Sequence, residues 1–203
     1  IGEGATLRRM IDSGNLSSFI LWGPPGVGKT TLAKIISSKL NAPFYTLSAV
    51  NSGVKDVREV IEKADKSRFF GSVSPILFID EIHRFNKGQQ DYLLPFVEDG
   101  TIIIIGATTE NPYFEVNGAL ISRSLIFELK PLEKEDIKIL LKRAVYDTTK
   151  GMGSFGAEIE EDALEFLADI SGGDARNALN AIELAILTTK RGEDGKIRIT
   201  LDV

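Results

Sequence analysis

The residues with the clearest chemical potential form a glycine-rich run near the start of the chain. They are Gly23, Pro24, Pro25, Gly26, Val27, Gly28, Lys29 and Thr30. A glycine, four intervening residues and then Gly-Lys-Thr form the arrangement that cradles phosphates, and here it lies between the apolar segment Phe19–Trp22 and a helical pattern from Lys29. Backbone N–H groups then surround the phosphates. We predict that Lys29 contacts the β- and γ-phosphates, that Thr30 binds Mg²⁺, and that Thr31 completes the loop's nucleotide contacts.

Two adjacent carboxylates follow a second apolar segment. Asp80 and Glu81 come directly after residues 76–79. A carboxylate at the carboxyl end of a strand can hold Mg²⁺ directly or through water, and we assign this role to Asp80. Glu81 is then positioned to polarise an attacking water. The alternative is a pair of solvated carboxylates that begins a loop, and the neighbouring phosphate loop disfavours it.

Four further side chains are candidates of lower specificity. Thr109 follows the apolar residues 102–105, and ligands gather at the carboxyl ends of strands in open α/β sheets, so Thr109 can orient water or contact the γ-phosphate. Its alternative is a strand-ending turn. Arg123 precedes the last apolar run, and Arg176 lies in the first turn of a predicted helix, where its charge opposes the dipole. Both can meet an anion or remain solvated. We interpret His83 as a structural residue.

Five short apolar segments supply the strands that must position these residues. They are residues 19–22, 44–47, 76–79, 102–105 and 125–127. Continuous apolar runs are typical of strands that are buried on both faces of a parallel sheet. Helical patterns separate them, and one begins with Asn86 and Gln89 as a predicted capping box and extends to about Val97. The alternation predicts an α/β fold with a parallel five-stranded sheet flanked by helices.

The pattern changes after Lys130, where only helices are expected. Three apolar stripes mark them: Ile137, Leu140, Leu141 and Ala144; Ala163, Leu164, Phe166, Leu167 and Ile170; and Ala175, Ala178, Leu179, Ile182 and Ile186. Asp174 is the predicted N-cap of the last helix, and the glycine-rich residues 151–156 are predicted to form a loop. We therefore divide the chain into a nucleotide-binding core, residues 1–130, and a small helical domain, residues 131–203.

Composition limits the remaining possibilities. The chain has no cysteine and a single histidine, which excludes disulfides, thiolate metal sites and sites built from several histidines. The net charge of −5 gives no overall basic excess for DNA binding. No apolar run approaches the roughly 20 residues of a membrane span. The chain begins Ile1, Gly2, Glu3, Gly4, without a signal peptide or an initiator methionine, and we expect it to be part of a longer chain.

Together these motifs resemble those of AAA+ ATPases in order and spacing. Three stretches carry a closer resemblance: residues 48–58, residues 80–87 and residues 106–112, which read SAVNSGVKDVR, DEIHRFNK and GATTENP. They are similar to the replication-associated recombination protein A family, whose eukaryotic member is the Werner-helicase-interacting protein. Val27 departs from the family, in which threonine is common at that position.

The resemblance implies roles that spacing alone does not assign. Lys29 and Thr30 look like the Walker A pair and Asp80 and Glu81 like the Walker B pair. Thr109 resembles sensor 1, Arg123 the arginine finger and Arg176 sensor 2 on the lid.

The resemblance also implies an activity and its setting. The family's members are DNA-dependent ATPases that use ATP and Mg²⁺ at stalled replication forks. They form homo-tetramers through a C-terminal region, and they contact single-stranded-DNA-binding protein and other replication factors. Their location is the bacterial cytoplasm at the nucleoid, or the nucleus in eukaryotes, and no membrane is involved. By the same resemblance, a family segment that helps to enclose the adenine would precede Ile1, and the oligomerisation region would follow Val203.

Several alternatives stay open at this point. The general motifs also suit a clamp-loader-like or branch-migration AAA+ subunit. A P-loop kinase is a further alternative, although the adjacent Asp80 and Glu81 and the helical domain argue against it. A scaffold subunit that does not hydrolyse ATP is the last, and the presence of Lys29, Glu81 and Arg123 argues against it.

Overall fold

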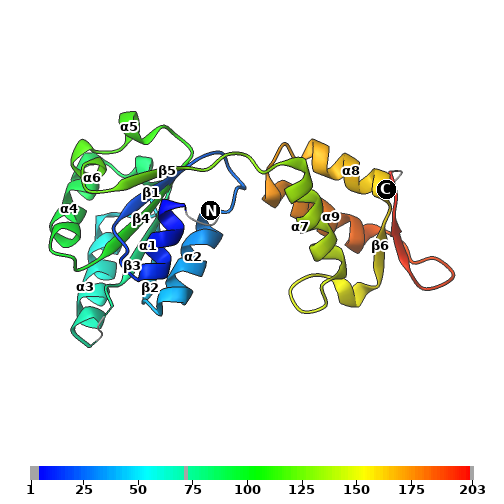
Figure 1. Ribbon diagram of the computed structural model, residues 1–203, viewed down its shortest axis with the longest axis horizontal. Helices are drawn as coiled ribbons and strands as arrows, with labels where there is room; N and C mark the ends of the chain where they lie inside the picture. The colour runs from blue at the N-terminus through cyan, green and yellow to red at the C-terminus, as the bar shows by residue number, and fades with distance from the viewer. Residues whose placement is uncertain (1–4, 71–72, 202–203) are drawn as a thin grey trace. The chain divides into compact units, whose positions relative to one another are not determined.

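The computed structural model describes residues 5–70 and 73–201, which divide into two compact units (Figure 1). The first unit comprises Gly28–Leu129 with the chain up to Gly23, and the second comprises the chain from Lys130 together with Pro24–Val27. The first four residues, for which we expect no signal peptide, lie outside the described ranges. Among the described residues, no helix has both the length and the apolar character needed to cross a bilayer.

A five-stranded parallel sheet forms the centre of the first unit. Its strands are β1 (Phe19–Trp22), β2 (Phe44–Ser48), β3 (Ile76–Asp80), β4 (Ile103–Thr108) and β5 (Leu125–Glu128). They lie in the order β2-β3-β4-β1-β5, and each neighbouring pair is parallel. The predicted fold class is therefore confirmed. Parallel strands bring their carboxyl ends to one edge, so the residues that follow β1, β3 and β4 emerge side by side.

Helices cover both faces of this sheet. They are α1 (Thr6–Ser13), α2 (Lys29–Leu40), α3 (Val54–Phe70), α4 (Lys87–Glu98), α5 (Pro112–Glu115) and α6 (Gly118–Ile121). Side chains of a strand alternate between faces. Phe19 and Leu21 accordingly pack with residues of α1 and α2, whereas Ile20 packs with residues of α3 and α4. The sheet thus separates two apolar cores, which fixes its strands on both sides.

Helix α4 begins as predicted. The Asn86 side chain accepts a hydrogen bond from the Gln89 backbone N–H at 2.9 Å, and the Gln89 side chain accepts from the Asn86 N–H at 3.0 Å. This reciprocal capping box satisfies two donors that the first turn would otherwise leave without partners. The helix ends at Glu98, one residue beyond the predicted end.

Among the residues that the structure describes, three α-helices and a small sheet form the core of the second unit. Helices α7 (Lys134–Tyr146), α8 (Glu161–Ile170) and α9 (Ala175–Thr188) enclose one apolar core. The prediction of helices alone was wrong, because β6 (Ala157–Ile159) and β7 (Ile197–Ile199) pair in parallel. Strands of three residues are too short for their alternation to stand out in a sequence. The glycine-rich residues 151–156 include the 3₁₀ helix η2 (Gly153–Phe155).

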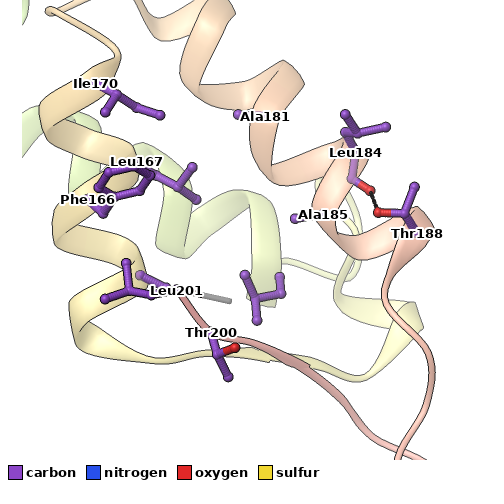
Figure 2. A pocket seen from close by; sticks show the side chains of 11 residues that line it. Phe166, Leu167, Ile170, Ala181, Leu184, Ala185, Thr188, Thr200 and Leu201 are labelled. Atoms are coloured by element: carbon purple, nitrogen blue, oxygen red, sulfur yellow. Dashed lines mark hydrogen bonds between the residues drawn. The ribbon is translucent and has the colours of Figure 1, made fainter. Parts of the chain in front are cut away.

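The predicted apolar stripes of the second unit are buried only in part. Ala163, Leu164, Ala178 and Ile182 are buried, as expected. Phe166 and Ile170 of the α8 stripe are 52% and 59% exposed, and Leu179 of the α9 stripe is 38% exposed. Phe166 and Ile170 line an open groove of about 260 Å³ between α8 and α9, and Leu201 also lines it (Figure 2). Helical spacing identified the apolar surface of these helices, but it does not show that part of this surface is exposed.

An ion-pair cluster joins α7 to α8. Lys138 pairs with Glu165 and Glu161, and Lys134 pairs with Glu165 and Asp169. Hydrogen bonds from Lys134 and Lys138 lower the pKa of the Glu165 carboxyl to about 2. Hydrogen bonds to Glu165 and Glu161 raise the pKa of the Lys138 amine above its usual range. The cluster therefore favours the charged form of each partner when the two helices are packed.

Candidate active site

The phosphate loop leaves the sheet between two neighbouring strands. The Gly23 N–H donates to the Thr108 carbonyl at the end of β4 (3.2 Å), and the Leu129 N–H donates to the Trp22 carbonyl (2.7 Å). A Cβ atom at Gly23 would lie 2.2 Å from the Leu129 carbonyl oxygen, which is closer than atoms can approach. Glycine is thus required where the loop begins, because the backbone of Leu129, directly after β5, passes beside it.

Helix α2 begins at the end of the loop. Gly28 is its N-cap with a φ of 90°, no side chain caps the helix, and no acidic residue lies in its first turn. The N–H groups of Lys29, Thr30 and Thr31 therefore begin a helix whose N-terminus attracts anions. The Lys29 side chain is buried, and its Nζ donates to the Gly23 carbonyl at 2.6 Å, across the loop. An uncapped N-terminus with a buried amine suits a phosphate chain.

The middle of the loop belongs to the second unit. Pro24–Val27 group with the residues from Lys130 onward, and the Ala175 N–H at the start of α9 donates to the Gly26 carbonyl at 3.1 Å. Gly26 has a φ of 71°, in the left-handed region that favours glycine. A Cβ atom there would lie 1.7 Å from Asp174 Oδ1. The conformation of the loop and its packing both require glycine at this position.

The carboxylates lie at the carboxyl end of β3. Asp80 is the last residue of β3, and its carbonyl accepts from the Ala49 N–H at 2.9 Å. Glu81 follows with a φ of 51°, a left-handed conformation that is unusual for a residue with a side chain and that occurs often at functional sites. Glu81 Oε2 lies 3.3 Å from Thr109 Oγ1 and 3.4 Å from the Thr109 backbone nitrogen, both of which donate to it. The structure therefore brings Glu81 and Thr109 together.

A second side chain reaches Glu81 from the 3₁₀ helix η1 (Ile82–Arg84). The Nδ1 atom of His83 lies 3.2 Å from Glu81 Oε2 and 2.8 Å from the hydroxyl of Thr108, the last residue of β4. The His83 side chain is 8% exposed. Thr108 is fully buried, and its hydroxyl also bonds to the backbone of Glu110. His83 thus links the carboxylate after β3 to the end of β4.

The expected metal-binding residues supply few oxygen atoms of their own. Among the described residues, no group of three or more His, Asp or Glu side chains could hold a metal ion. Thr30 and Asp80 offer one hydroxyl and one carboxylate. These are hard oxygen donors, and Mg²⁺ bound to a nucleotide takes its other ligands from phosphate and water. The donor set therefore suits Mg²⁺ that arrives with a nucleotide.

Arg123 lies at the amino-terminal ends of the strands, whereas the residues described above lie at their carboxyl ends. It precedes β5, its Nη1 donates to the Ala119 carbonyl (2.9 Å) and the Ser122 hydroxyl (3.1 Å), and it forms an ion pair with Glu98. The strand β5 spans four residues, about 13 Å at 3.3 Å per residue. The structure thus does not bring Arg123 to Glu81 and Thr109 in the same chain.

Arg176 lies in the first turn of α9. Its backbone N–H and that of Asn177 donate to Asp174 Oδ1 at 2.8 and 3.1 Å, so Asp174 is the N-cap that the sequence predicted. The Arg176 side chain is exposed. It belongs to the second unit, and its contact with a phosphate stays a prediction.

Two residues beside Glu81 and Arg123 were not identified as functional from the sequence. A single histidine carries no pattern in a sequence, and Glu98 lies one residue beyond the predicted end of its helix. His83 lies two residues after Glu81, but its link to Thr108 joins residues 25 positions apart, as does the ion pair of Arg123 with Glu98. Such distant links have no local signal in the sequence. The arrangement as a whole can bind a phosphate chain and can polarise a water molecule with Glu81.

Comparison with known families agrees with this geometry. Residues 19–132 match the family described as "ATPase family associated with various cellular activities (AAA)". Residues 153–203 match the family described as "AAA C-terminal domain". The two matches cover the sheet with its phosphate loop and most of the second unit.

Curated proteins resemble the chain over nearly its whole length. The chain is 50% identical to Replication-associated recombination protein A of Haemophilus influenzae, over 97% of this chain and 44% of that protein. It is 48% identical to the protein of the same name in Bacillus subtilis, over 100% of this chain and 47% of that protein. Identity to the ATPase WRNIP1 of Dictyostelium discoideum is 51%, over 95% of this chain and 22% of that protein. The chain thus spans less than half the length of these relatives.

A solved structure shares the arrangement of the chain. The Thermotoga maritima RuvB Holliday junction branch migration motor superposes with a TM-score of 0.74 and 29% sequence identity. The match covers 97% of this chain and 62% of that one. The likeness extends the agreement from sequence to three-dimensional structure.

Proposed function

The chain belongs to the AAA family of ATPases, and from that premise we propose that it is the ATP-hydrolysing part of a protein that acts on DNA at stalled replication forks. Its likeness to Replication-associated recombination protein A and to WRNIP1 supports this choice within the family. The observation that carries the proposal is the pair of Thr109 hydrogen bonds to Glu81, at the sheet edge from which the phosphate loop also leaves.

Each residue of this edge has a chemical role in the proposal. Lys29 contacts the β- and γ-phosphates through a charge-assisted hydrogen bond. The Thr30 hydroxyl and the Asp80 carboxylate hold Mg²⁺. Glu81 accepts a proton from the water that attacks, and Thr109 fixes the orientation of the Glu81 carboxylate.

Bound ATP supplies the phosphoryl group that water receives, and Mg²⁺ neutralises charge on the phosphates. Other residues of the chain shape the phosphate loop and contact the nucleotide. Gly23, Gly26 and Gly28 let the loop turn around the phosphates. Arg123 extends from one subunit toward the site of the next, and Arg176 contacts the nucleotide from the second unit.

The activity of the whole protein is a further part of the proposal. We expect ATP hydrolysis to be stimulated by DNA and the protein to assemble as a homo-tetramer. Contacts with single-stranded-DNA-binding protein and replication factors, and a location with the DNA, follow from the same resemblance. A negative net charge of −5 implies that DNA is bound by a local basic surface or by other parts of the protein.

Likeness to the RuvB branch migration motor favours a second candidate, a motor that moves DNA junctions. Identity to that structure is 29%, whereas identity to the recombination protein of Haemophilus influenzae is 50%. We therefore prefer the first proposal. The two candidates differ in the DNA that should stimulate them, because a branch migration motor requires a four-way junction.

The test is ATP hydrolysis by the full-length protein on a panel of single-stranded, duplex, gapped, forked and four-way-junction DNA. The first proposal expects the greatest stimulation with forked or gapped DNA. The Glu81→Gln variant serves as the background control on every DNA. Stimulation by four-way junctions alone would favour the second candidate, and a rate that Glu81→Gln leaves unchanged would contradict both.

A further inference from the structure

His83 is the one histidine in the sequence, and its side chain is nearly buried beside Glu81. The roles described above do not use it. Its Nδ1 atom faces two oxygen atoms, Glu81 Oε2 at 3.2 Å and Thr108 Oγ1 at 2.8 Å. An imidazole nitrogen either carries a proton and donates or carries a lone pair and accepts. The two neighbours together decide which of these applies.

The Thr108 hydroxyl has one proton, and the backbone of Glu110 accounts for it. Thr108 Oγ1 lies 3.2 Å from the Glu110 carbonyl, to which it can only donate. It also accepts from the Glu110 N–H at 3.0 Å. With its proton used in this way, the hydroxyl can only accept from His83.

The Glu81 carboxylate leads to the same conclusion. An ionised carboxylate is an acceptor only. A lone pair on His83 Nδ1 would face this carboxylate oxygen at 3.2 Å without a proton between them. A proton on Nδ1 satisfies both neighbours at once, shared between the hydroxyl and the carboxylate.

Glu81 Oε2 then receives three donors, the His83 Nδ1–H, the Thr109 N–H and the Thr109 hydroxyl. Among the residues that the structure describes, no hydrogen bond reaches the other carboxylate oxygen, Oε1. One oxygen is thus held in place while the second stays available to accept a proton. This division suits a general base, which must be fixed in orientation and still present a free lone pair.

We propose that His83 is a positioning residue, which donates from Nδ1 to hold the Glu81 carboxylate toward the attacking water and ties it to the end of β4 through Thr108. The proposal rests on Glu81 as the general base of the proposed ATPase. It assigns no contact between His83 and the nucleotide. Its effect on the rate is through the geometry of Glu81, where a displacement of about 1 Å can cost about 10²-fold.

Two substitutions of His83 distinguish the loss of its hydrogen-bond donor from the loss of its packing. Asparagine can offer an amide N–H in place of Nδ1–H, whereas alanine removes the donor. In the full-length protein we expect His83→Ala to lower kcat by about 10-fold or more, with ATP affinity changed less than about twofold. His83→Asn should recover most of the lost kcat. Arg84→Ala, an exposed position on the same turn, is the control.

The single histidine permits a second readout that needs no hydrolysis. In the ¹⁵N-labelled chain, the imidazole gives one pair of nitrogen signals, and we expect the Nδ1 signal to be that of a protonated nitrogen. Glu81→Gln removes the carboxylate and should shift this signal.

Three results would overturn the proposal for His83. They are a lone pair on Nδ1, a kcat that His83→Ala leaves within twofold of the wild type, and a folded His83→Asn variant that is as slow as His83→Ala. A wild-type protein without ATPase activity would instead contradict the proposed function, because the nitrogen signals do not depend on turnover. The two failures are therefore distinguishable.

Discussion

Arg123 is paired with Glu98, a residue at the end of α4, at the amino-terminal edge of the sheet. Both side chains are partly exposed, at 39% and 48%. An exposed pair of this kind contributes about 1 kcal/mol or less, so exchange of its carboxylate for a phosphate is energetically easy. The phosphate-loop residues Gly23 and Lys29 lie at the other edge. The position of Arg123 therefore favours action on a neighbouring subunit.

We predict that full-length Arg123→Ala binds ATP normally but hydrolyses it about 10³-fold more slowly, the lower range for loss of an arginine finger. Mixing this variant with Glu81→Gln should restore activity, because some interfaces then join an intact Glu81 to an intact Arg123. ATPase assays on mixtures of defined ratio measure the effect. Mixed oligomers that regain no turnover, or full activity in a verified monomer, would exclude action between subunits.

Substitutions of Lys29 and Glu81 should have different effects on ATP binding and on ATP hydrolysis. Lys29→Ala removes a charge-assisted hydrogen bond of about 1.5–3 kcal/mol, so ATP affinity should fall by about 10- to 100-fold. Glu81→Gln should leave affinity nearly unchanged and lower kcat by about 10²-fold or more. Calorimetric titration with ATP and single-turnover hydrolysis provide the two measurements.

Glu115→Gln, an exposed carboxylate on α5, is the matched control for these variants. It should change neither affinity nor rate. Weak ATP binding by Glu81→Gln would show that its assigned role is wrong.

Arg176 should couple nucleotide binding to movement of the second unit within its own subunit. A ligand shifts such an equilibrium only if it binds one arrangement better than the other. X-ray scattering of the full-length protein should therefore differ between the empty state and the state with an ATP analogue. Arg176→Ala should lose most of that difference, whereas Lys190→Ala, which is also exposed on the second unit, should keep it. An unchanged response in Arg176→Ala would count against this role.

The ion pairs between α7 and α8 predict a loss of stability in acid. The pKa of Glu165 is lowered from 4.5 to about 2 in the folded state. Folding therefore gains from ionised Glu165 above a pH of about 4.5, and this gain disappears as the pH falls toward 2. Glu165→Gln should be less stable than the wild type at pH 7, and the gap should narrow below pH 4.5.

Urea unfolding followed by circular dichroism between pH 7 and pH 3 measures this gap. Glu183→Gln, on α9 and without an ion pair among the described residues, is the control. A gap that stays constant down to pH 3 would contradict the prediction.

The fold of the first unit could be predicted because its signals are local. Continuous apolar runs such as Phe19–Trp22 identify the strands, and the runs of β1, β3 and β4 are followed by the candidate residues of the site. The outer strands β2 and β5 are only partly buried, because each has a single neighbour in the sheet. The second unit was predicted less well. The strands β6 and β7 are too short for a pattern, and the exposure of Phe166 depends on packing around α8 that helical spacing does not encode.

The site shows the same limit. Lys29, Asp80 and Glu81 belong to motifs whose spacing along the chain reflects their chemistry. The links from His83 to Thr108 and from Arg123 to Glu98 join residues 25 positions apart in sequence. No local pattern encodes such pairs, because the parallel sheet and its crossover helices create them. The sequence therefore indicates candidate groups for the reaction but not the residues that contact them.

The separation of Arg123 from the phosphate loop, at opposite ends of the strands, bears on the symmetry of the assembly. A contact between one end of the sheet in one subunit and the opposite end of the sheet in its neighbour is heterologous. Subunits joined by this contact therefore follow one another head to tail. A closed ring then contains as many complete sites as subunits, an open arc contains one fewer, and a two-fold pair cannot complete both sites by this contact. The ratio of fast-hydrolysing sites to subunits consequently reports whether the oligomer is a closed ring or an open arc.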